Sequence, residues 1–203
     1  MRVFHSLIAL AFLLAWLTGE SKRLIVLHAS LGYLMAALLA LRLVYGLLGP
    51  RSVRWGPVIR RLRDVPDLLR GLGSKRVLDI AFWRRLEAAL MALVTAALLA
   101  LTIPMVLSGH AASEKWGAWL FGGRWVASLH EGTAYAYLVL VIAHLTILAL
   151  MSLLHWRNAA SPMLTGRMTG RGPDLLRSDR KPLGIALAVS AVLMLIWLIQ
   201  TLR

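Results

Sequence analysis

The chain has 203 residues, 59% of them hydrophobic, and a mean hydropathy of +0.72, which excludes an ordinary soluble domain and predicts an integral membrane protein. The formal net charge of +14 does not indicate nucleic-acid binding, because the basic residues are gathered in particular loops between apolar runs. The absence of cysteine excludes disulfides, thiolate metal sites, iron–sulfur clusters and covalently attached c-type haem. Any cofactor must therefore be held without thiolates, and histidine is the obvious ligand.

Apolar runs predict five membrane-spanning helices, so we expect an all-α fold in which the whole chain is one membrane domain. The first run starts with a basic residue but has no convincing small-residue cleavage site, which favours a retained span over a signal peptide. The predicted spans cover about residues 3–19, 24–48, 86–107, 129–154 and 183–202.

The loops between these spans differ in charge. Residues 49–85 and 155–182 are rich in arginine, whereas the other two connections hold two basic residues each. Basic loops remain in the cytoplasm, where their side chains also contact anionic lipid headgroups. The N-terminus is therefore predicted to be cytoplasmic and the C-terminus to lie outside.

The fourth predicted span carries two histidines, His130 and His144, in an almost wholly apolar run. Their separation is two heptads, so on an α-helix the two side chains drift only about 40° around the axis and share one face. Along the axis they lie roughly 21 Å apart, which is most of the way across a bilayer. Because an imidazole is costly to leave unpaired in lipid, we expect two separate sites on this helix, one in each leaflet.

Two further histidines lie in the first two predicted spans, and the topology gives each a partner at a similar depth. We expect His28 to pair with His130 on the outer side and His5 to pair with His144 on the inner side. A planar tetrapyrrole needs two axial imidazoles on facing helices, and the core of a four-helix bundle provides that geometry. The sequence therefore predicts a four-helix haem-binding bundle followed by a fifth, C-terminal span.

Two residues of the second span complete the candidate cofactor-binding set. Gly32 lies one turn after His28 and would leave room for the edge of a macrocycle beside the backbone. Arg42 follows His28 by fourteen residues, so it lies near the inner pair, where it could bind a haem propionate; the alternative is that it snorkels to the interface. His110 and His155 lie at predicted loop boundaries and are interpreted as solvated. No catalytic residue is predicted.

A family resemblance is carried by the segments RVFHSLIALAFLLAWLTGE, LHASLGY, LRLVYGLLGPR, SLHEGTAYAYLVLVIAHL and SLLHWRNAASPMLTGRM. Together they extend over roughly residues 2–168 and resemble the prokaryotic cytochrome b561 family, which is related to the b-type cytochrome subunit of nickel–iron hydrogenases. The resemblance implies a bundle that binds two haem b groups, one through His28 with His130 and one through His5 with His144. The fifth span departs from the shortest members of the family and could dock a partner subunit or a second copy of the chain.

The function that the resemblance implies is electron transfer across the cytoplasmic (inner) membrane of a bacterium. The expected partners are membrane lipid, quinone, and a c-type cytochrome, partner dehydrogenase or other redox subunit, with superoxide as a further substrate in some members. Whether the chain is itself an oxidoreductase depends on that terminal partner.

The competing class is a haem-free membrane anchor or assembly subunit, in which the histidines form only interhelical hydrogen bonds. Such bonds contribute about 0.6 kcal/mol each on average in membrane proteins. Four histidines at these positions would therefore stabilise helix packing only weakly, which disfavours a purely structural role.

Overall fold

The computed structural model describes residues 1–49, 53–74, 79–114, 124–156, 158–161, 163 and 181–202. These described residues form helices and no strand, so the all-α prediction is confirmed. Parts of the predicted basic loops, at 50–52, 75–78 and most of 155–182, lie outside the description. The elements are α1 (Arg2–Thr18), the 3₁₀ helix η1 (Lys22–Leu24), α2 (Ile25–Leu48), α3 (Gly56–Gly71), α4 (Ile80–Ser113), α6 (Arg124–Leu154) and α8 (Lys181–Thr201).

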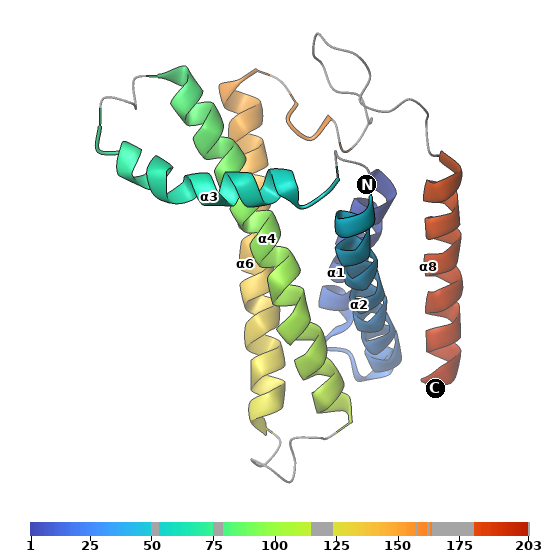
Figure 1. The fold of residues 1–203 in the computed structure, drawn as a ribbon. Coiled ribbons are helices and arrows are strands. Elements are labelled where there is room, and N and C mark those ends of the chain that lie inside the picture. The colour runs from blue at the N-terminus through green and yellow to red at the C-terminus, as the bar shows by residue number, and fades with distance from the viewer. Residues whose placement is uncertain are drawn as a thin grey trace.

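Helices α1, α2, α4, α6 and α8 run side by side, and α3 lies across one end of them (Figure 1). Within the described residues, α2 with η1, α4, α6 and α8 are each long and apolar enough to cross a membrane. Helix α1 has 17 residues and extends about 25 Å, somewhat less than the hydrocarbon core of a bilayer. The N-terminus lies at the end near α3, which we call the inner end after the predicted topology, and α8 ends at the opposite, outer end (Figure 1).

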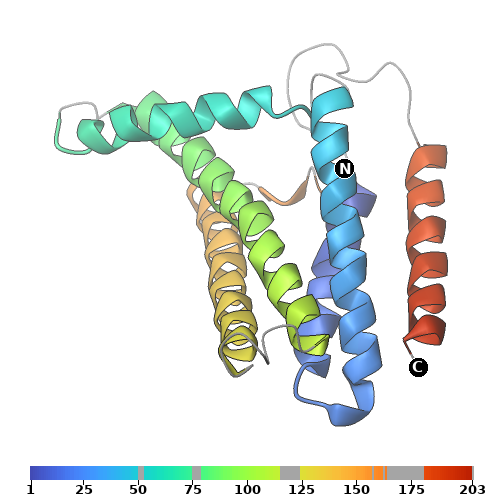
Figure 2. The same ribbon diagram turned by 60° about the horizontal axis from the view of Figure 1, so that its bottom comes forward.

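The connection 49–85, predicted as a loop, contains helix α3 and the start of α4. Helix α4 begins at Ile80 rather than near residue 86 because the Asp79 carboxylate caps it, accepting a hydrogen bond of 2.8 Å from the Ala81 N–H. Helix α3 packs on α4 through a small apolar core of Leu68, Phe82 and Ala89. Both views show α3 crossing α4 near the inner end of the bundle (Figure 2).

The main core joins the N-terminal hairpin of α1 and α2 to the hairpin of α4 and α6. Leu31 and Met35 of α2 are each 1% exposed and lie at its centre. Between the hairpins, Phe12 of α1 and Tyr137 of α6 are both buried, and their ring centroids lie 4.6 Å apart. Tyr137 is midway along α6 between His130 and His144, so this aromatic contact separates two levels of the bundle.

Candidate functional site

The outer level contains His28 from α2 and His130 from α6. Their ring centroids lie 5.9 Å apart with the rings almost perpendicular, at 89°. The Nδ1–H of His28 donates to the carbonyl of Ala15, and the Nδ1–H of His130 donates to the carbonyl of Met105, each at 2.9 Å. Because a carbonyl can only accept, these bonds keep the proton on Nδ1 and leave the Nε2 lone pair free to bind a metal. The structure therefore brings His28 and His130 together, and their pairing as ligands of one haem stays a prediction.

A cavity of about 420 Å³ adjoins the outer pair, and both imidazoles lie in its wall. Its lining is mostly apolar and comes from α1, α2, α4 and α6. Gly32 is also in this wall, and no atom outside its own stretch of helix backbone lies within 4 Å of the position that a Cβ would take there. On the facing helix a Cβ at Gly109 would lie 2.9 Å from Cε1 of His130, so glycine lets that ring lie against α4. The cavity therefore has space beside Gly32, as the sequence predicts.

The inner level contains His5 from α1 and His144 from α6, whose ring centroids lie 6.3 Å apart at an angle of 37°. Two buried side-chain nitrogens in the described part of the chain lack a hydrogen-bond partner, namely Nδ1 of His144 and Nη1 of Arg42. A buried polar atom without a partner is costly, so an unpaired nitrogen of this kind is one that a bound group can satisfy. The structure also brings His5 and His144 together, and their pairing as haem ligands likewise stays a prediction.

Arg42 is only 9% exposed, which favours the predicted bundle-facing position over snorkelling to the interface. Its guanidinium carbon lies 4.2 Å from the ring centroid of Trp55, in a cation–π contact. The indole fits against Gly46, where a Cβ would overlap it, and the backbone N–H of Trp55 donates to the Gly46 carbonyl at 3.2 Å. Trp55 directly precedes α3, which crosses the inner end of the bundle, so Arg42 lies at that end. Burial, with repulsion from Arg2 and then Arg42, lowers the pKa of the Met1 amino group.

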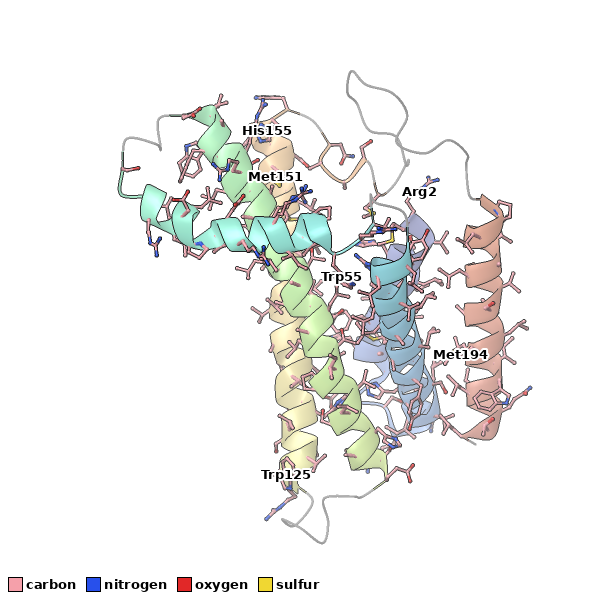
Figure 3. All side chains as sticks on the ribbon, viewed as in Figure 1. Arg2, Trp55, Trp125, Met151, His155 and Met194 are labelled. Carbon is pink, nitrogen blue, oxygen red and sulfur yellow. The ribbon has the colours of Figure 1, made fainter. Side chains whose placement is uncertain are left out.

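Trp55 was not predicted from the sequence. It lies at the junction of α2 and α3, beside the bundle (Figure 3). The one signal available was Gly46, which leaves a gap one turn after Arg42. That signal does not say which residue fills the gap.

His110 and His155, which were predicted to be solvated, are instead partly buried, and both have hydrogen-bond partners. Helix α4 continues to Ser113, so His110 lies within a helix, lines the outer cavity and hydrogen-bonds through Nδ1 to the Tyr33 hydroxyl at 2.7 Å. His155, at the inner end of α6 (Figure 3), contacts both carboxylate oxygens of Glu87 on α4 through Nε2, at 2.9 and 3.1 Å. The first histidine belongs to the outer cavity, and the second links two helices.

The histidine geometry fits axial ligation of a planar cofactor. In the described residues, no group of three or more His, Cys, Asp or Glu side chains could hold a metal ion, so each level offers two imidazoles. Metal–imidazole bonds are about 2 Å long, so two imidazoles on opposite sides of one metal have ring centroids roughly 6 Å apart. Both pairs match that spacing. The residues present therefore fit haem, whose macrocycle supplies the remaining four nitrogens.

Comparison with known families adds an independent finding. The family described as prokaryotic cytochrome b561 matches residues 1–166, which include both histidine pairs, Gly32 and Arg42 but not α8. Comparisons with curated proteins and with solved structures gave no match. The family match assigns haem b binding and a role in electron transfer to a membrane protein. The chain belongs to the prokaryotic cytochrome b561 family.

Proposed function

We propose that the chain is a dihaem b-type cytochrome that carries electrons across the cytoplasmic membrane. His28 and His130 hold the outer haem, and His5 and His144 hold the inner haem. The observation that supports this best is the presence of two imidazole pairs with ring centroids 5.9 and 6.3 Å apart. Each pair has one member on α6, and these two residues, His130 and His144, are separated by roughly 21 Å along that helix.

Bound haem supplies one-electron redox chemistry. The carbonyls of Ala15 and Met105 orient the outer imidazoles through Nδ1 and make Nε2 a stronger ligand. At the inner level, the buried Nη1 of Arg42 offers a charge-assisted hydrogen bond to a propionate. The tilted rings of Phe12 and Tyr137 fill the core between the levels and exclude water from it.

The electron partners we propose are quinone within the bilayer and a redox partner at the membrane surface. The surface partner is a c-type cytochrome, a partner dehydrogenase or superoxide, in the inner membrane of a bacterium. Family membership supports this proposal, because it assigns the chain to a group of membrane cytochromes of electron transfer. Quinone reduction or superoxide oxidation at this subunit would make it an oxidoreductase.

A reduced-minus-oxidised optical spectrum, with haem quantified per polypeptide, tests the proposal. We expect about two haem b groups in the wild type and one fewer in His144→Ala and in His130→Ala, because each histidine serves a different site. Absence of haem from folded, detergent-purified wild-type protein would contradict the proposal and favour a haem-free anchor subunit.

A further inference from the structure

The wall of the outer cavity contains a pair of polar side chains that are not among the proposed haem ligands. Tyr33 of α2 and His110 of α4 both line the cavity, and the Tyr33 hydroxyl lies 2.7 Å from Nδ1 of His110. Their ring centroids lie 5.8 Å apart, at 67°. This contact joins the α1–α2 hairpin to the α4–α6 hairpin on a cavity wall that also contains Gly32.

The Tyr33–His110 pair differs from the buried serines of the same helices. The hydroxyls of Ser30 and Ser108 are buried and donate to carbonyls of their own helices. Tyr33 instead directs its hydroxyl to a side chain across the cavity wall, where its oxygen both accepts and donates. A polar pair of this kind in a mostly apolar pocket is the feature that fixes the orientation of a ligand.

We propose that Tyr33 and His110 form a binding subsite for a carboxylate of the molecule that fills the outer cavity. The Nδ1–H of His110 donates to the phenolic oxygen, which turns the phenolic hydrogen toward the carboxylate. Tyr33 is the binding group, and His110 is a positioning residue that acts through it. The inference rests on the proposed function, in which that carboxylate is a propionate of the outer haem.

The outer haem therefore has a different propionate partner from the inner haem. The inner site offers a permanent cation, Arg42, whereas the outer site offers a neutral phenol oriented by an imidazole. A hydrogen bond to a charged acceptor stabilises binding by about 1.5–3 kcal/mol, which corresponds to roughly a tenfold or greater gain in affinity.

The test uses the full-length chain with His144→Ala, so that only the outer site binds. Apoprotein in detergent is titrated with haem b and, separately, with haem b dimethyl ester, which lacks free carboxylates, and the Soret band gives both dissociation constants. The measured quantity is the ratio of the ester constant to the haem b constant. We expect Tyr33→Phe and His110→Leu each to lower this ratio about tenfold, and His110→Asn, whose amide donates in place of Nδ1, to restore it.

Tyr45→Phe, which removes a hydroxyl from α2 toward its inner end, is the matched control and should leave the ratio unchanged. An unchanged ratio in both Tyr33→Phe and His110→Leu would overturn the subsite while leaving haem binding intact. A parent protein that binds neither compound would instead overturn the proposed function. Two different variants keep the test decisive if one of them fails to fold.

Discussion

The outer and inner histidine pairs share one ligand chemistry, but the protein supports them differently. At the outer level, His28 and His130 each donate Nδ1–H to a backbone carbonyl of a neighbouring helix. At the inner level, Nδ1 of His144 and Nη1 of Arg42 are buried without partners. An unsatisfied buried group costs about 1–3 kcal/mol, so a bound cofactor would stabilise the inner level by giving these two nitrogens hydrogen-bond partners. The outer imidazoles, in contrast, are already oriented by the protein before any cofactor binds.

A side chain that fills the outer cavity should cause the largest difference between the sites, because it excludes the outer haem and leaves the inner haem bound. In Gly32→Leu the new side chain enters the space beside His28, where nothing outside its own stretch of helix backbone lies within 4 Å of the Cβ position, so the fold tolerates it but the outer haem is excluded. We expect about half of the haem per polypeptide to be lost, measured from the reduced-minus-oxidised spectrum. Gly132→Leu is the control, because Gly132 also has open space around its Cβ but is exposed on α6. Full haem content in Gly32→Leu would show that the cavity is not the haem site.

Removing the inner cation should change potential rather than haem content. Arg42→Gln deletes a buried positive charge that favours the reduced, less positive haem, so the inner midpoint potential should fall. A buried charge near a redox centre is worth about 1–2 kcal/mol, so we expect a decrease of roughly 60 mV. Spectroelectrochemical titration in a His130→Ala background isolates the inner haem.

Arg70, one of the exposed arginines of helix α3, provides the control for that measurement. Arg70→Gln changes the net charge equally but at a solvated position, where screening weakens the interaction. It should shift the inner potential little. Equal shifts in Arg42→Gln and Arg70→Gln would rule out a specific role for Arg42.

Removing Trp55 should also lower the midpoint potential of the inner haem, but by less than removing Arg42. Trp55→Leu deletes the cation–π contact with Arg42, which contributes about 0.5–2 kcal/mol, and admits water to the guanidinium. Better solvation screens the charge of Arg42, so the inner potential should fall by less than in Arg42→Gln. A larger fall in Trp55→Leu would mean that the indole affects the haem directly and not through Arg42.

The smallest expected effect lies outside both sites. Glu87 and His155 are 16% and 24% exposed and join α4 to α6 at the inner end. Glu87→Gln should lower the free energy of unfolding in detergent by about 1–2 kcal/mol while leaving both haem potentials unchanged. Glu114→Gln, at the exposed outer end of α4, should leave stability unchanged. A change in either potential in Glu87→Gln would show that the Glu87–His155 contact is coupled to a site.

The helical spans and the two histidine pairs were predictable because both depend on periodicity and depth. The spacing of His130 and His144 fixes one face of α6, and charge in the loops assigns His5 and His28 to opposite ends of the bundle. The structure brings each predicted pair together. Periodicity could do this because an apolar run of membrane length leaves one regular structure available to the backbone.

The features that were missed depend on contacts between distant residues or on helix ends. Helix α3 combines dense arginine with an internal Pro66, so hydropathy alone reads it as a loop. His110 was placed at a loop boundary because the extension of α4 to Ser113 has no apolar signal. Its contact with Tyr33, 77 positions away in the chain, and the contact of Trp55 with Arg42 follow from packing that a single sequence does not encode locally.

The most direct test of the two-site account is the haem content of two double variants, measured from the reduced-minus-oxidised spectrum per folded polypeptide. His5→Ala with His144→Ala removes both ligands of one proposed site, whereas His130→Ala with His144→Ala removes one ligand from each site. The account predicts about one haem b in the first variant and none in the second. Equal haem content in the two variants would contradict pairing of the histidines across helices at two levels.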